Sequence, residues 1–155
     1  MNLKLVQEEL QNAKITTTFL KADDNVPVER VMALFEMEDK SPDESQLLEI
    51  MLLPDVSEEL NGLEVIQYFV SSHFESSKIS QNKIEELNQL IIQFNFELVI
   101  GSFGWDINEN YIYFKYRQVI STNKEGKLNG KVVIITNLIH HQINKYMRLL
   151  EDIVK

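Results

Sequence analysis

Cysteine is absent from the 155 residues of this chain. Disulfide bonds, thiolate zinc sites and cysteine nucleophiles are therefore excluded. Proline and glycine are also scarce, with three and five residues respectively, which argues against a disordered or low-complexity chain. A chain without cysteine fits a reducing compartment.

Long apolar runs are missing as well. The first residues, MNLKLVQEELQNAK, place charges too close together for the apolar core of a signal peptide. No apolar run approaches the roughly 20 residues that a membrane-spanning helix needs. We therefore expect a cytoplasmic protein that does not bind membranes.

Positively charged residues are fewer than negatively charged ones. The chain has 15 Lys and Arg against 24 Asp and Glu, a formal net charge of -9. Nucleic-acid binding requires clustered Lys and Arg side chains that neutralise phosphates, so nucleic acid is not an expected partner. The negative charge favours solubility and would suit a basic partner.

Helical periodicity appears in several segments of the chain, which has the length of one domain. Apolar side chains recur every three or four residues over 2–13, 81–94 and 131–154, which predicts helices there. The β-branched start of the last segment leaves open that it begins as a strand. Asn95 is the predicted end of the second helix.

Strands are predicted where apolar residues alternate with polar ones or where β-branched residues gather. The segments are 15–21, 28–37, 46–53, 96–103 and 111–121. Segment 63–73 is either a strand or a helix, with its β-branched and aromatic content favouring a strand. The expected fold is a single α+β domain over 1–155, with an antiparallel sheet of about five to six strands and helices packed on one side.

A possible metal loop lies between the last two predicted strands. Asp106, Asn108 and Asn110 have the spacing of the first three ligands of a calcium loop. The sixth position is Tyr111 instead of glycine, and the twelfth is Arg117 instead of glutamate. We therefore interpret the cluster as hairpin-turn residues and predict no metal site.

Catalytic motifs are not found. His140 and His141 are adjacent, so on a helix their side chains diverge and cannot readily share one ion. Gly101 and Gly104 are too close together for a phosphate-binding loop and are predicted to permit a bend, a bulge or a close backbone approach. We predict no catalytic residues and no cofactor, and expect a protein that is not an enzyme.

Apolar residues occupy both faces of the predicted sheet. Tyr111 and Tyr113 lie opposite the core positions of their strand, and Met51 and Leu53 do the same in the strand 46–53. A sheet with one solvated face normally alternates more cleanly. Either a loop such as 38–45 covers the second face or a partner does, and the predicted partner-binding residues are Met51, Leu53, Tyr111 and Tyr113.

The segment LIIQFNFELVIGSFGWDINENYIYFKYRQVI resembles the YbjN-like proteins, which share the fold of bacterial type III secretion chaperones. The similar features are Asn95 at the end of a helix, Gly101 and Phe103 before an Asp/Asn turn, and a strand of aromatic and basic residues from Tyr111 to Arg117. A long C-terminal helix follows, as in that family. The resemblance implies a noncatalytic protein that binds a protein partner, often as a dimer, with no active site to transfer.

The expected function is that of a protein-binding module, chaperone-like or regulatory, whose partner is another protein or a second copy in a homodimer. One alternative is a small ligand-binding protein or enzyme with a pocket between sheet and helices, using His140 or His141 with a carboxylate. Another alternative is an immunity or antitoxin protein, which small size and acidity would suit.

Overall fold

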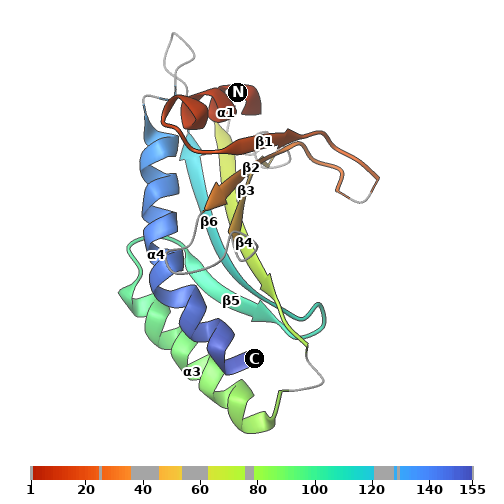
Figure 1. The fold of residues 1–155 in the computed structure, drawn as a ribbon, viewed down its shortest axis with the longest axis vertical. Coiled ribbons are helices and arrows are strands. Elements are labelled where there is room, and N and C mark those ends of the chain that lie inside the picture. The colour runs from red at the N-terminus through yellow and green to blue at the C-terminus, as the bar shows by residue number, and fades with distance from the viewer. Residues whose placement is uncertain are drawn as a thin grey trace. The chain divides into compact units, whose positions relative to one another are not determined.

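The computed structural model describes residues 2–24, 26–35, 46–53, 63–75, 79–120, 128 and 130–154 (Figure 1). The described helices and strands confirm the α+β class. In chain order they are α1 (Leu3–Asn12), β1 (Thr17–Leu20), β2 (Arg30–Phe35), β3 (Gln46–Leu52), β4 (Glu64–His73), α3 (Gln81–Glu97), β5 (Ser102–Asp106), β6 (Tyr111–Ile120) and α4 (Lys131–Val154).

The strands form one six-stranded antiparallel sheet in the order β1-β2-β3-β4-β6-β5. Segment 63–73 is a strand, β4, as its composition favoured. The last helix, α4, begins at Lys131 as a helix and not as a strand.

Contacts divide the chain into two compact units. The first contains Met1–Tyr68 and Arg117–Leu138, and the second contains Phe69–Tyr116 and Ile139–Lys155. Strands β4 and β6 and helix α4 contribute residues to both. The single domain over 1–155 stays a prediction, and each unit is described by itself below.

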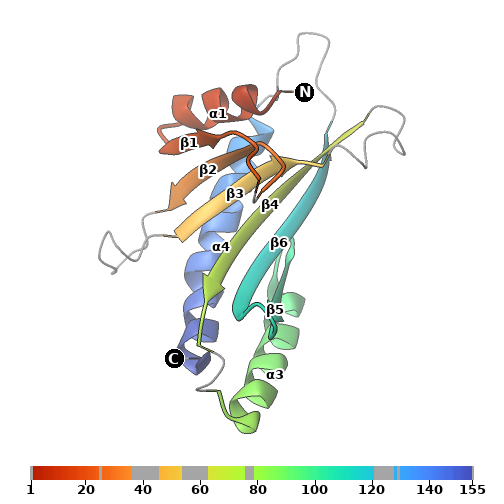
Figure 2. The same ribbon diagram turned by 90° about the vertical axis from the view of Figure 1, so that its right-hand side faces the viewer.

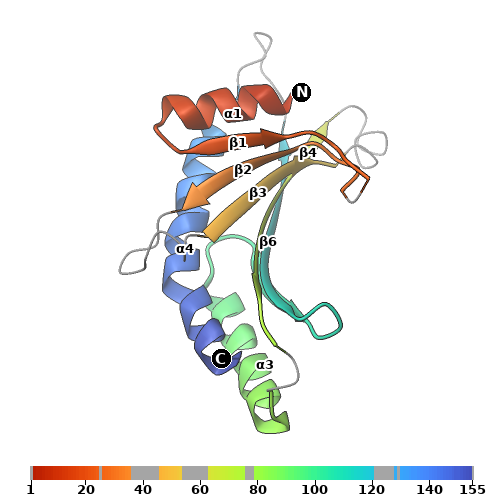
Figure 3. The ribbon, with the colours of Figure 1, turned by 45° about the vertical axis from the view of Figure 1, so that its right-hand side comes forward.

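The first unit packs α1 against β1 and β2 (Figure 3). Helix α1 begins where the Asn2 side chain accepts a hydrogen bond from the Lys4 backbone N–H at 2.9 Å, a common N-cap. It buries Leu3, Val6 and Leu10. Strands β1, β2 and β3 lie side by side (Figure 2), and Ala33 of β2 is paired with Leu48 of β3, both fully buried.

The second unit packs α3 beside the C-terminal half of α4 (Figure 1). Helix α3 starts after Ser80, whose hydroxyl accepts a hydrogen bond from the Lys83 backbone N–H. The rings of Phe94 on α3 and Tyr146 on α4 lie 4.8 Å apart. Strands β5 and β6 pair in this unit, and the buried rings of Phe103 and Phe114 meet edge to face at 5.4 Å.

Two boundary predictions in this unit are wrong. Helix α3 does not stop at Asn95 but continues to Glu97, and the strand expected over 96–103 is instead the last turn of α3, a connection, and only the start of β5. The hairpin with the strand predicted over 111–121 is confirmed, because β5 pairs with β6 across a short turn.

The side chain of Asn95 explains the first error. The side-chain amide makes both hydrogen bonds that a neighbouring strand would make to Phe103. Its Oδ1 accepts from the Phe103 backbone N–H at 2.7 Å, and its Nδ2 donates to the Phe103 carbonyl at 3.0 Å. Asn95 therefore anchors the edge strand β5 to α3 instead of ending the helix.

A buried glutamine explains the second error. The Gln142 side chain of α4 accepts hydrogen bonds from the backbone N–H groups of Val99 and Ile100 and donates to the Ile100 carbonyl. A side chain more than 40 positions away thus satisfies backbone groups that a strand ladder would otherwise have paired.

The interpretation of the Asp/Asn cluster as a turn is supported by the structure. Asp106 Oδ1 accepts from the backbone N–H groups of Asn108 and Glu109 at 2.9 and 3.1 Å. Asn110 has a φ of 57°, a left-handed conformation that Asn tolerates. A Cβ added at Gly101 would lie 2.3 Å from the Phe114 ring, so the predicted close approach is also present.

Candidate functional site: an aromatic face of the sheet

In the second unit, α3 and residues 139–154 of α4 pack against one face of the strands. Trp105 Nε1 on β5 donates to Asn88 Oδ1 on α3 at 2.8 Å, and the Phe103 ring meets that of Tyr146 on α4. Side chains alternate between the two faces along a strand. The neighbours of these residues on β5 and β6 therefore point away from the helices.

Four aromatic side chains gather on the face that points away from the helices. Tyr111 and Tyr113 come from β6, and Phe69 and His73 come from β4. Phe69 and Tyr113 are stacked with ring centroids 5.8 Å apart, and Tyr111 contacts Phe69, Tyr113 and His73 at 6.2, 5.8 and 5.6 Å. We call Phe69, His73, Tyr111 and Tyr113 the aromatic face.

The Tyr113 ring lies close to the backbone of the neighbouring strand β5. Gly104 is its cross-strand partner on β5, and a Cβ added there would lie 2.5 Å from the Tyr113 Cζ and hydroxyl oxygen atoms. Lys115 places its Nζ 5.5 Å from the centre of the same ring. The glycine therefore makes room for a flat, partly exposed ring on the sheet surface.

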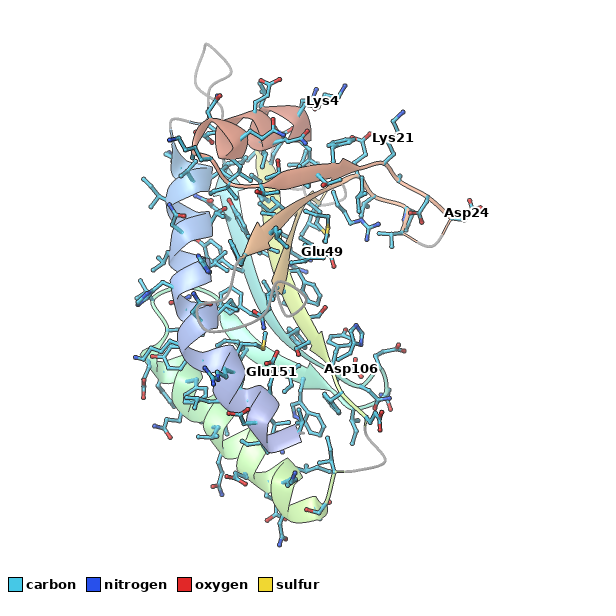
Figure 4. All side chains as sticks on the ribbon, in the orientation of Figure 1. Lys4, Lys21, Asp24, Glu49, Asp106 and Glu151 are labelled. Atoms are coloured by element: carbon cyan, nitrogen blue, oxygen red, sulfur yellow. The ribbon has the colours of Figure 1, made fainter. Side chains whose placement is uncertain are left out.

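The other end of the aromatic face is acidic. Asp106, labelled in Figure 4, is the cross-strand partner of Tyr111. Directly paired side chains of neighbouring strands share a face of the sheet, so the Asp106 carboxylate lies on the face of Tyr111. Partial burial, and then the negative charge of Asp106, raise the pKa of the Tyr111 hydroxyl above its ordinary value. Tyr111 therefore ionises at a higher pH than a tyrosine in water does.

The predicted partner-binding residues fall in different units. Tyr111 and Tyr113 form half of the aromatic face. Met51 and Leu53 lie in the first unit, where Met51 Sδ accepts a weak hydrogen bond from Gln67 Nε2 at 3.6 Å and the Leu53 N–H donates to the Val65 carbonyl. Their binding role stays a prediction. The loop 38–45, which the sequence left open as the alternative cover for this face, lies outside the described residues.

Sequence reasoning missed Phe69 and His73. The sequence of segment 63–73 fits both a strand and a helix, so it does not by itself assign these residues to a face of the sheet. As a strand, β4 alternates Ile66, Tyr68 and Val70, which are buried, with Gln67 and Phe69, which are partly exposed. That alternation was visible in the sequence and places Phe69 and His73 on one face.

Among the residues that the structure describes, the other polar groups do not form a recognisable reaction centre. His140 Nε2 lies 2.9 Å from Asn144 Nδ2 one turn further along α4, and His141 is exposed. Ser72 donates to the largely buried Glu151 at 2.6 Å, which joins β4 to α4. Within the described residues, no group of three His, Asp or Glu side chains is arranged to hold a metal ion.

Comparisons with family models, curated proteins and solved structures found no match to this chain. Among the helices that the structure describes, none has the length and apolar character needed to cross a membrane.

Proposed function

We propose that this chain is a noncatalytic, cytoplasmic protein-binding module, chaperone-like or regulatory, that uses the aromatic face to dock a protein partner. The observation that supports the proposal is the cluster of Phe69, His73, Tyr111 and Tyr113 on the sheet face opposite the helices.

Rings in this position have the properties of an interface. Phe69, Tyr111 and Tyr113 are partly exposed, and His73 is exposed. Tyrosine is enriched in protein interfaces because its ring contributes a large apolar area while its hydroxyl keeps a hydrogen-bond partner. Mutual contacts among the rings fix their orientation, which lowers the entropy lost on binding.

The resemblance to the YbjN-like proteins and to the type III secretion chaperone fold points in the same direction. The strand of aromatic and basic residues on which that resemblance rests includes Tyr111 and Tyr113, which form half of the aromatic face.

A capture experiment with matched variants tests the proposal. The second unit also exposes Ile92 and Phe96 on α3, at 59% and 87%, which is a rival apolar surface. Wild-type protein, the Tyr111→Ser/Tyr113→Ser variant and the Ile92→Ser/Phe96→Ser variant are immobilised, and proteins captured from native-host extract are quantified by mass spectrometry. Circular dichroism checks that each variant is folded.

The proposal predicts a protein that is captured by the wild type and the α3 variant and is lost with the tyrosine variant. Loss only with the α3 variant would assign binding to the helix and contradict the proposal. Capture that is unchanged in both variants would contradict it as well.

A further inference from the structure

We propose that the segment docked on the aromatic face presents an arginine or lysine side chain to Tyr111 and Asp106. This inference rests on the proposed function and adds the chemistry of the partner.

The carboxylate of Asp106 is placed for such a contact. Directly paired residues on neighbouring antiparallel strands have Cβ atoms about 5 Å apart, so Asp106 lies beside the Tyr111 ring. Its Oδ1 holds the turn through Asn108 and Glu109. Its Oδ2 makes no hydrogen bond within the part of the chain that the structure describes, so it can accept one from a partner.

A ring beside a carboxylate is a favourable environment for a cation. A guanidinium or ammonium group is attracted to the face of an aromatic ring, and arginine also forms strong hydrogen bonds to carboxylates. The aromatic face already makes a contact between a cation and a ring, because Lys115 lies over Tyr113. Tyr111 lies at the end of the face where Asp106 and the exposed Glu109 lie. Among the residues that the structure describes, its ring contacts Phe69, His73 and Tyr113 and no lysine or arginine.

The net charge of the chain favours a basic partner over a second copy of the chain. Each copy has a formal net charge of -9, so two copies repel each other, whereas a basic segment is attracted. The charge of the whole chain and the local charge at Asp106 therefore favour the same partner chemistry.

Nuclear magnetic resonance titrations of the full chain test the inference. The probe is an extended peptide of alternating valine and threonine with one arginine, and its control replaces arginine with citrulline, which has nearly the same shape and no charge. The protein variants are Asp106→Asn, which keeps the Oδ1 acceptor of the turn, and Glu85→Gln, which removes one charge from the exposed side of α3.

The expected result is that the arginine peptide shifts the amide signals of Phe69, His73, Tyr111 and Tyr113. Citrulline and Asp106→Asn should each weaken binding about tenfold, the two losses should not add, and Glu85→Gln should have little effect. If Asp106 had a purely structural role, the losses of affinity from citrulline and from Asp106→Asn would add.

Three results would overturn the inference. Equal binding of the citrulline peptide would reject the cation and leave the proposed function standing. Signals of the aromatic face that shift with protein concentration alone would identify a second copy as the occupant, which also leaves the proposed function standing. If neither peptide shifts these signals at millimolar concentration, the inference and the proposed function both fail.

Discussion

At the scale of single residues, two glycines with the same backbone conformation have different surroundings. Gly101 and Gly130 have φ angles of 71° and 73°. A Cβ at Gly101 would overlap the Phe114 ring, whereas a Cβ at Gly130 would meet nothing within 4 Å. A comparison of the two positions therefore separates backbone strain from steric overlap.

We expect Gly130→Ala to lower the free energy of unfolding by about 1 kcal/mol, the cost of a left-handed alanine. Gly101→Ala should cost about 2 kcal/mol more, because the Phe114 ring must also move. Urea denaturation of both variants measures the difference, and equal losses would show that the ring moves aside freely.

The pKa of Tyr111 gives a second prediction at this scale. Burial and the Asp106 charge raise this pKa above the ordinary value of 10.0. The folded state therefore holds the phenol proton more tightly than the unfolded state does. The resulting stability is fully present below pH 10.0 and is lost as the pH rises through the folded-state pKa.

Ultraviolet titration of the wild type and Tyr111→Phe checks the sign. The difference between the two curves should show a tyrosine that ionises later than free tyrosine. A difference curve centred below the ordinary tyrosine pKa would contradict the described environment.

At the scale of elements, the helices and most strands could be predicted because their apolar periodicity is local. The region around Asn95 could not, because its conformation depends on partners far away in the sequence. The alternation of residues after Asn95 resembles that of a strand. In the structure, however, the Gln142 side chain of α4 hydrogen-bonds the Val99 N–H and the Ile100 carbonyl in that stretch. The aromatic face was only half predicted for a related reason, since Phe69 joins Tyr113 through the pairing of β4 with β6.

Replacement of Asn95 by alanine tests the link between α3 and β5. We expect a loss of about 1–3 kcal/mol in the free energy of unfolding, because two hydrogen bonds to Phe103 disappear. Amide hydrogen exchange at Phe103 should become faster. The exposed Gln93→Ala on the same helix is the control and should leave this exchange rate unchanged.

At the scale of the whole molecule, contacts between distant segments hold the chain together. Glu9 on α1 accepts a hydrogen bond from the backbone N–H of Gly130, immediately before α4. A carboxylate at this position also stabilises the N-terminus of the helix through the helix dipole. The two residues are 121 positions apart, so this contact closes a large loop within the first unit.

We expect Glu9→Ala to lower the free energy of unfolding by about 1–3 kcal/mol, since it removes a charged hydrogen-bond acceptor from a helix start. Glu8→Ala, on an exposed position of the same helix, should change it by less than about 0.5 kcal/mol. Thermal and urea denaturation measure the free energy of unfolding of both variants. A similar loss in the two variants would show that the Glu9 contact does not stabilise the fold.

Site-specific photo-crosslinking in the native host tests whether the aromatic face binds a protein. A benzophenone amino acid replaces Tyr113 in one strain and the exposed Gln89 of α3 in another. We expect a discrete adduct with one partner protein at position 113 and none at position 89. The same adducts at both positions, or none at position 113, would contradict it.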